Sequence, residues 1–232
     1  MPKKRIVALT GAGVSSESGI RTFRDSGGLW EDHDIMDVAT PEAWDRNMDL
    51  VLEFYNQRRK QLYGVSPNAA HFALVELERK FDVQIITQNV DDLHEQAGST
   101  QVMHLHGELK KVRSSLREDL VYPLEGWELR RGDLCELGSQ LRPHVVWFGE
   151  AVTMIPAAAE LCSTADILLI IGTSLNVYPA AGLVSYVPSG TPVYLIDPGD
   201  LGVAHIPNLT FIKEKAGTGT PRLVKQLLQG NP

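Results

Sequence analysis

The segment His104-Leu105-His106-Gly107-Glu108 carries two histidines at alternate positions. An imidazole changes charge near neutral pH, so a histidine that opens onto a substrate cleft can serve as a general base. If the segment is a strand, both histidines face the same side and could instead bind a metal, although no third ligand of suitable spacing stands nearby. A structural histidine is the more common outcome, so the segment alone leaves these three roles open.

A glycine-rich turn directly follows the first apolar run of the chain. Its residues are Gly11, Ala12, Gly13, Val14, Ser15, Ser16, Glu17, Ser18, Gly19 and Ile20. Bare backbone amides at the start of a helix can face a pyrophosphate, and glycines permit its close approach. The usual dinucleotide fingerprint has a third glycine where this chain has Ser16, and such turns also occur for structural reasons alone. The turn by itself therefore favours nucleotide binding no more than a structural role.

Polar residues also follow the second apolar run. Residues 87–94 read TQNVDDLH and lie where a strand would end. In open α/β sheets ligands bind at the carboxyl ends of the strands, and Asn89 and Asp91 could orient ribose hydroxyls and an amide there. Taken alone, however, Asp91 and Asp92 are better explained as caps of the next helix.

Two later segments complete the set. Residues 143–150 read PHVVWFGE, and residues 172–179 read GTSLNVYP directly after an apolar run. Each could be no more than a strand followed by a turn. The four segments together are far more specific than any one of them, because their order and spacing would have to coincide by chance.

Short apolar, β-rich runs separated by helical patterns must position these segments. The runs are residues 6–9, 83–86, 167–171 and 192–196. Such runs suit strands that are buried on both faces of a parallel sheet, so the fold class is α/β. Proline positions and apolar spacing predict helices that begin near Pro41, Met48 and Pro67, and after Pro221. Residues 113–143 break this rhythm and indicate an insert.

The composition of the chain excludes several classes of protein. Its 232 residues are 43% hydrophobic, enough to bury a core, and the formal net charge is −7 with the basic residues scattered. Without a basic stripe, nucleic-acid binding is not expected. No apolar stretch reaches the roughly 20 residues that span a bilayer, and the 2 cysteines are too few for a disulfide framework. We therefore expect a cytoplasmic protein that binds neither membranes nor nucleic acid.

The order of the four segments resembles the sirtuin family, and the resemblance covers nearly the whole chain. It rests on GAGVSSESGIRTFR, TQNVDDLH, HLHGEL, PHVVWFGE and GTSLNVYPAAG. The resemblance implies an NAD-dependent enzyme that removes acyl groups from protein lysines and releases nicotinamide and an O-acyl-ADP-ribose. It also implies a Rossmann-like parallel sheet with helices on both faces, from residues 1–31, 64–112 and 144–232, and a smaller domain from residues 32–63 and 113–143.

The resemblance assigns roles to individual residues. His106 would be the general base that takes a proton from a ribose hydroxyl, and Asn89 and Asp91 would share the catalytic centre. The residues implied to bind NAD are Gly11, Ala12, Gly13, Ser15, Gly19, Ile20, Phe23, Arg24, Gln88, Asn89, Asp91, Gly172, Thr173, Ser174, Asp197 and Ala216. Asp197 stands where many sirtuins have asparagine against the ribose, so the chain departs from the family pattern there.

Acyl specificity can be inferred from a helical pattern at residues 54–59. Tyr55 and Arg58 are three residues apart and share a helix face, where a phenol and a guanidinium could recognise a carboxylate. The pair is similar to that of the sirtuins that remove succinyl and malonyl groups, and small Ala39 stands where that class keeps room for the acyl chain. Without this resemblance, Arg58 would belong to a run of three cations on a solvated helix face. We therefore expect removal of succinyl and malonyl groups and of acetyl.

The protein substrate, an acylated lysine in its peptide, is expected to bind as an added strand between residues 146–149 and 175–177. The implied contacts are Val146, Phe148, Gly149 and Val177. Pairing through the main chain gives little sequence preference, so the pattern indicates no particular partner protein.

One departure from the family concerns the structural zinc that four cysteines hold in most sirtuins. Here Ser114 and Gly138 stand where cysteines are expected, and Cys135 remains alone. We therefore expect no zinc and an insert that is held by apolar packing instead. The residues predicted to provide this packing are Leu120, Tyr122, Leu124, Trp127 and Leu141.

Three other functions fit parts of the pattern. An NAD-dependent protein ADP-ribosyltransferase would not need a pair of side chains that binds an acyl carboxylate, such as Tyr55 and Arg58. A non-catalytic NAD-sensing module could lose His106, Asn89 and Asp91, which are all present. A dehydrogenase is disfavoured by the missing third glycine and by the lack of a recognisable substrate domain.

Overall fold

The computed structural model describes residues 2–20, 33–175, 177–200, 202 and 206–230 of the chain. Within these residues, the larger part is a sheet of six parallel strands. In spatial order the strands are β3 (Val102–His104), β2 (Asp82–Thr87), β1 (Arg5–Thr10), β7 (Ile167–Ile171), β8 (Val193–Ile196) and β9 (Leu209–Ile212). The four predicted apolar runs are the inner strands, whereas the edge strands β3 and β9 are too short to show a pattern.

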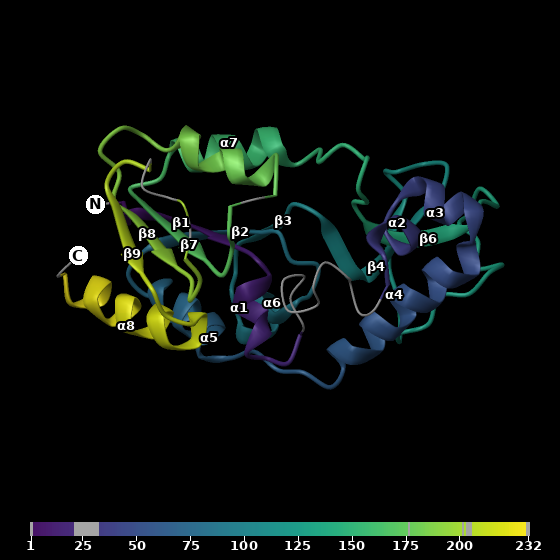
Figure 1. Ribbon diagram of the computed structural model, residues 1–232, viewed down its shortest axis with the longest axis horizontal. Coiled ribbons are helices and arrows are strands. Elements are labelled where there is room, and N and C mark those ends of the chain that lie inside the picture. Colours follow the sequence, from purple (N-terminus) through teal and green to yellow (C-terminus); the bar gives the residue numbers. More distant parts are fainter. Residues whose placement is uncertain (1, 21–32, 176, 201, 203–205, 231–232) are drawn as a thin grey trace.

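The two faces of this sheet bury separate apolar cores, because alternate residues of a strand point to opposite sides. Ile6 and Ala8 of β1 point to one core, and Val7 and Leu9 point to the other. The covering elements are α5 (Ala69–Leu77) and α8 (Ala216–Gln229) on the first face, and α7 (Ile155–Ser163) and the 3-10 helix η1 (Ala180–Tyr186) on the second. Figure 1 shows α7 above the sheet and α5 and α8 below it, which confirms the predicted α/β fold.

Helix α8 begins earlier than the sequence predicts. Its first residue is Ala216, and Pro221 lies inside the helix rather than before it. The prediction is wrong because Gly217 and Gly219 are weak helix formers, so the segment resembles a loop. Glycine at 219 has a packing reason, since a Cβ there would lie 2.7 Å from Cγ2 of Ile196. Because glycine has no Cβ, α8 can pack closely against β8.

The smaller domain combines an antiparallel sheet with a layer of helices. Its strands in spatial order are β5 (Val121–Pro123), β4 (Gly107–Ser114) and β6 (Leu141–Val145). The helices are α2 (Ile35–Val38), α3 (Pro41–Arg46) and α4 (Met48–Leu62), beside this sheet at the right of Figure 1. Val51 of α4, Leu109 of β4 and Trp147 share one apolar core. The small sheet extends beyond the predicted insert of residues 113–143 at both ends.

Polar contacts occupy the part of the insert where the resemblance to sirtuins implies cysteines. The Ser114 and Ser139 hydroxyl oxygens lie 2.7 Å apart, and the Cys135 Sγ lies 3.0 Å from Ser139 Oγ. Of the residues predicted to pack the insert, those that border the apolar core are Tyr122, Leu124 and Leu141. The described part of the chain contains no group of three His, Cys, Asp or Glu side chains that could hold a metal ion. The absence of zinc stays a prediction.

Two short helices follow the first two strands of the large sheet. They are α1 (Ala12–Ser16) after β1 and α6 (Leu93–Ala97) after β2. Both lie at the carboxyl ends of the strands, where the predicted cofactor residues stand. None of the described helices is long and apolar enough to cross a membrane.

Candidate active site

The loops that carry the predicted site meet at the carboxyl ends of the central strands. In the order β3-β2-β1-β7-β8-β9, the chain runs outward from β1 in one direction and from β7 in the other. Such a switch point is where open α/β sheets bind ligands. The glycine-rich turn after β1 and the turn that begins at Gly172 after β7 flank this point.

Glycines let these two turns touch. A Cβ at Gly11 would lie 2.7 Å from the Thr173 Cβ, and one at Gly13 would lie 2.7 Å from the Gly172 Cα. Gly172 has a φ of +63°, a left-handed conformation that glycine adopts without strain. The Gly11 and Gly13 amides donate to the carbonyls of Ile171 at 3.0 Å and Gly172 at 2.8 Å. These two amides hold the turns together and do not face open space.

Gln88 and Asn89 connect a third loop to both turns. The Asn89 side-chain amide donates to the Gly11 carbonyl at 3.2 Å and to the Ser15 hydroxyl at 3.1 Å. The Gln88 side-chain amide donates to Thr173 Oγ1 at 3.2 Å. These five residues, all predicted to bind NAD, therefore form one connected group.

The same loop orients His106. Its Nδ1 lies 3.0 Å from the Gln88 carbonyl oxygen, and since a carbonyl only accepts, Nδ1 carries the proton. The neutral ring then has its lone pair on Nε2. Burial lowers the pKa of His106, and the Gln88 carbonyl offsets this only in part. The imidazole is therefore neutral near pH 7 and can accept a proton.

His104 differs from His106 in both respects. Its Nδ1 lies 2.9 Å from the Asn89 carbonyl oxygen, and its Nε2 lies 2.8 Å from a Glu95 oxygen. Burial alone would lower the pKa of His104, but the hydrogen bond and charge of Glu95 outweigh it and raise the pKa. Both ring nitrogens are occupied, which gives His104 a structural role. Strand β3 ends at His104, so the two histidines do not share one strand.

Asp91 and Asp92 have separate roles. The Asp91 Oδ1 accepts the Leu93 amide at 3.2 Å, so this residue turns the chain into α6. Burial raises the pKa of the Asp91 carboxyl, although the Leu93 amide and the Ser15 hydroxyl both favour its charged form. Asp92 pairs with Lys110 at 2.6 Å and makes no side-chain cap. Asp91 therefore forms an Asx turn before α6 and also contacts the glycine-rich turn.

The other residues predicted to bind NAD lie in the loops after β1, β7, β8 and β9. The Asp197 carboxylate is buried and accepts the Gly199 amide of its own loop at 2.8 Å. Ala216 is buried at the start of α8. The remaining members of this set within the described chain are Ala12, Gly19, Ile20 and Ser174. Phe23 and Arg24 lie outside the described residues.

Tyr55 and Arg58 of helix α4 are both buried. Tyr55 is fully buried, and its hydroxyl accepts a hydrogen bond from the Trp147 indole at 3.0 Å. Arg58 is 6% exposed and lines a cavity of about 450 Å³ with Phe54, while Tyr55 is not on the described wall. The adjacent Arg59 is 0% exposed. A solvated helix face is therefore the wrong description of this part of α4.

The segment predicted to pair with a substrate peptide is attached to other parts of the site. The Val146 amide donates to the His106 carbonyl at 2.9 Å, and the Phe148 amide donates to the Ala39 carbonyl at 3.0 Å. Ala39 itself is 1% exposed. The predicted peptide contacts that are exposed are Phe148 (53%), Gly149 and Val177 (45%).

Comparison with known proteins identifies the family. The Sir2 family model matches residues 11–179. The NAD-dependent protein deacylase of Helicobacter pylori strain 26695 is 53% identical over 227 residues, which are 97% of this chain and 98% of the relative. The NAD-dependent protein deacylase of Bacteroides thetaiotaomicron is 53% identical over 230 residues, with the same shares. The chain belongs to the Sir2 family.

Solved structures of Sir2 proteins have the same fold. A Sir2 homologue in complex with NAD has a TM-score of 0.87 and 38% identity, covering 99% of this chain and 91% of the homologue. A mutant of a Sir2 homologue with ADP ribose has a TM-score of 0.89 and 38% identity, covering 98% and 93%. This Sir2 protein is an NAD-dependent protein deacylase.

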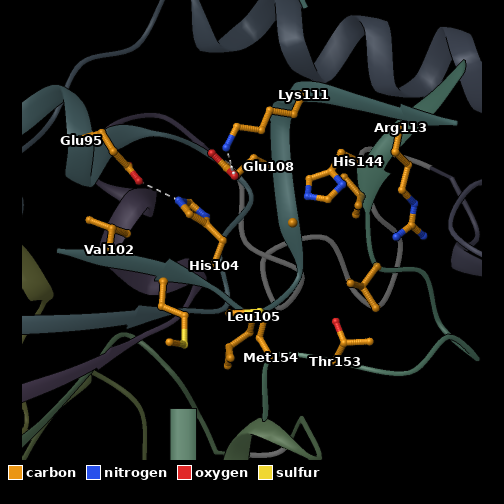
Figure 2. A pocket seen from close by; sticks show the side chains of 14 residues that line it. Glu95, Val102, His104, Leu105, Glu108, Lys111, Arg113, His144, Thr153 and Met154 are labelled. Carbon is orange, nitrogen blue, oxygen red and sulfur yellow. Dashed lines mark hydrogen bonds and ion pairs between the residues drawn. The ribbon is translucent and has the colours of Figure 1, made fainter. Parts of the chain in front are cut away.

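A second cavity, of about 610 Å³, is lined by the residues on both sides of His106. Figure 2 shows two charge pairs on its wall, Glu95 with His104 at 2.8 Å and Lys111 with Glu108 at 2.6 Å. Arg113, also on the wall, lies 3.1 Å from a Glu150 oxygen. Since each of these cationic side chains faces a carboxylate, they provide no surplus charge for a bound ion.

The sequence prediction gives no side-chain role to three residues in and beside the Sir2 motif PHVVWFGE, although Trp147 lies in the segment predicted to pair with a peptide. Arg142, Trp147 and Glu150 contact one another and connect the motif to Tyr55. Tyr55 and Trp147 are 92 positions apart in the chain. The local signal is limited to a tryptophan and a glutamate in a short motif, so only the fold brings these side chains together.

Proposed function

We propose that this deacylase removes succinyl and malonyl groups from protein lysines, in addition to acetyl. The observation that carries the proposal is the position of Arg58, a guanidinium that is 6% exposed on the wall of a cavity. Arginine stays charged at any physiological pH, and its planar fork fits a carboxylate in two-point contact. Tyr55 lies close enough to interact electrostatically with Arg58 and adds a phenol.

NAD is proposed to bind at the switch point between β1 and β7. Asn89, Asp91 and Thr173 are only 7%, 5% and 7% exposed at this edge. Their polar side chains meet the glycine-rich turn at the carboxyl ends of the strands, where open α/β sheets bind nucleotides, so this set fits a ligand rich in hydroxyl and amide groups. When bound, NAD supplies the ribose that receives the acyl group. The glycine-rich turn, Gln88 and Gly172 would complete its binding site.

His106 is proposed as the general base, with Nε2 as the atom that takes the proton from a ribose hydroxyl. Its Nδ1 contact with the Gln88 carbonyl keeps the ring in the required tautomer. Its carbonyl also accepts the Val146 amide, so the base and the peptide segment are held together. Asn89 and Asp91 support the same loop from the glycine side.

The substrate is proposed to be an acylated lysine in an extended peptide that adds a strand beside Val146, Phe148, Gly149 and Val177. Two of these side chains, Phe148 and Val177, are half exposed, as an open docking edge requires. A mutant Sir2 solved with a deacetylated p53 peptide has a TM-score of 0.77 and 29% identity to this chain, and it covers 97% of the chain.

The test compares matched peptides that carry succinyl-lysine or acetyl-lysine, with and without NAD, by mass spectrometry of the peptide and of O-acyl-ADP-ribose. We expect both acyl groups to be removed only with NAD, and succinyl faster than acetyl. Removal of acetyl alone would end the proposal for acidic acyl groups. Consumption of NAD without removal of either acyl group would instead indicate ADP-ribosyl transfer.

A further inference from the structure

The two histidines of the segment HLHGE contact successive carbonyls of one loop. Strand β2 ends at Thr87, and the neighbouring strand β3 ends at His104. The carbonyls of Gln88 and Asn89 therefore lie beyond the hydrogen bonds that pair these two strands. The His106 Nδ1 lies 3.0 Å from the Gln88 oxygen. The His104 Nδ1 lies 2.9 Å from the Asn89 oxygen, so each imidazole provides the donor that its carbonyl needs.

The second ring nitrogen of His104 faces a carboxylate. Its Nε2 lies 2.8 Å from a Glu95 oxygen on the wall of the cavity in Figure 2. A carbonyl and a carboxylate can only accept hydrogen bonds, so both nitrogens of His104 carry protons and the ring is charged. The raised pKa of His104 agrees with this state. A charged imidazole that uses both protons inside the protein cannot act as a base, but it holds its two partners in place.

The contact with His104 completes a set of hydrogen bonds that hold Asn89. The backbone amide of Asn89 donates to Thr87 Oγ1 at 3.0 Å. Its side-chain nitrogen donates to the Gly11 carbonyl at 3.2 Å and to the Ser15 hydroxyl at 3.1 Å. Among the contacts of the described residues, Oδ1 is the one polar atom of Asn89 that has no partner. An amide oxygen accepts hydrogen bonds, so Oδ1 is the atom that can take one from a ribose hydroxyl.

We propose that His104 is a positioning residue for NAD, because its Nδ1–H fixes the Asn89 carbonyl and thereby directs the Asn89 side-chain oxygen toward the ribose. This inference rests on the proposed NAD site at the switch point and adds a residue to it. Glu95 supports the same contact, since its carboxylate holds the other side of the imidazole. The two histidines then have separate tasks: His106 accepts the proton of the ribose, and His104 orients the loop.

The test uses two substitutions that each keep one half of the imidazole. The side-chain nitrogen of asparagine is as far along the side chain from Cβ as Nδ1, so His104→Asn can still donate to the Asn89 carbonyl. The side-chain nitrogen of glutamine is as far from Cβ as Nε2, so His104→Gln keeps the Glu95 contact and loses the one to Asn89. Both variants remove the ring and its charge, so a loss that comes from packing or charge affects both.

We expect His104→Gln to lower kcat/KM for NAD about fivefold to tenfold, because the hydrogen bond that fixes Asn89 is lost. His104→Asn should change this kcat/KM by no more than about twofold, and both variants should keep kcat/KM for the acylated peptide at saturating NAD within about twofold. The assay pH is 6.5, since the pKa of His104 lies above this value and that of His106 lies below it. Equal losses in the two variants, or a loss in neither, would overturn the inference.

A double-mutant cycle with Asn89→Ala separates this inference from the proposed NAD site. If His104 acts through the Asn89 side chain, His104→Gln should cost nothing further in kcat/KM for NAD once Asn89→Ala is present. Additive losses would overturn the inference. If Asn89→Ala alone leaves kcat/KM for NAD unchanged, the proposed NAD site is wrong, and the inference falls with it.

His144→Gln is the matched control for the loss of an imidazole, since His144 lines the same cavity as His104. We expect it to keep kcat/KM for NAD near that of the wild type. A loss in His144→Gln as large as that in His104→Gln would show that any histidine on this wall matters equally, and it would overturn the specific role of the contact with Asn89.

Discussion

The edge proposed to bind NAD and the part of the small domain proposed to bind the acyl group are held together in different ways, and they are called here the cofactor edge and the acyl end. At the cofactor edge, backbone turns touch because Gly11, Gly13 and Gly172 have no side chains. At the acyl end, long charged and aromatic side chains touch, with Arg142 over the Trp147 ring and the indole on the Tyr55 hydroxyl. In the first region, a Cβ added at any of these glycines would collide with the facing turn. In the second, substitutions at Tyr55 or Arg58 remove a polar group and add no atom to a closed contact, so they should change specificity before they change the fold.

The largest effect should come from His106, whose ring contacts the Gln88 carbonyl and whose own carbonyl accepts the Val146 amide. His106→Ala should lower kcat/KM by about 10²–10⁴-fold for succinyl and acetyl alike, because it removes the general base. Steady-state assays with both peptides measure this. His144→Gln is the control, a partly buried histidine outside the proposed site, and should leave both rates near those of the wild type. Retention of activity by His106→Ala would exclude His106 as the base.

Gly172 and Gly138 both have a positive φ, so the same substitution at each position separates the effect of close packing from that of backbone conformation. Gly172→Ala should lower the free energy of unfolding by more than about 3 kcal/mol and abolish NAD binding, since a Cβ there would lie 2.3 Å from the Val14 nitrogen. Gly138 has a φ of +75°, but a Cβ there would meet no described heavy atom within 4 Å. Gly138→Ala should cost only about 1–2 kcal/mol and keep NAD binding. Denaturant titration and NAD titration test both, and equal costs would contradict the account.

The cofactor edge could be predicted from sequence because its signals are local. Buried strands appear as continuous apolar runs, and the polar loops follow them directly. The acyl end could be predicted only in part, since residue types and helical spacing place Tyr55 and Arg58 together on one face of α4. The contacts of Tyr55 with Trp147, and of Arg59 with β4, join residues 92 and 50 positions apart. Contacts between residues so far apart leave no periodic pattern in the sequence. The alternative of a solvated helix face is wrong because these long-range contacts bury that face.

The adjacent residues Arg58 and Arg59 should have different effects. Substitution of Arg58 should change acyl specificity, and substitution of Arg59 should change stability. Arg59 is fully buried and donates to the carbonyls of Leu109 and Trp127, both at 2.8 Å. Burial lowers the pKa of Arg59 to about 10. Arg59→Met should lower the free energy of unfolding by about 2–4 kcal/mol, because it leaves buried carbonyls unpaired, and it should leave the ratio of succinyl to acetyl activity unchanged. A shift in that ratio, measured beside denaturant unfolding, would contradict the separation.

The smallest effect concerns pH and should be the same for both acyl groups. Burial lowers the pKa of His106 below the 6.5 of free imidazole, so the neutral base persists to lower pH than usual. The kcat/KM should therefore be level above pH 6.5 and fall by about tenfold per unit only below the pKa of His106 in the folded protein. The measurement is kcat/KM from pH 5 to 8 on each peptide. A fall that begins above pH 7 would contradict the burial of a neutral base.

The central claim is that Arg58 reads the carboxylate of the acyl group. The most direct test is the ratio of kcat/KM for succinyl-lysine to that for acetyl-lysine in one peptide, measured in the wild type and in Arg58→Met. We expect a ratio well above one in the wild type and a ratio that falls by about tenfold or more in the variant, because a charge-assisted contact is lost from one substrate only. Equal losses on both substrates, or a wild-type ratio below one, would contradict the claim.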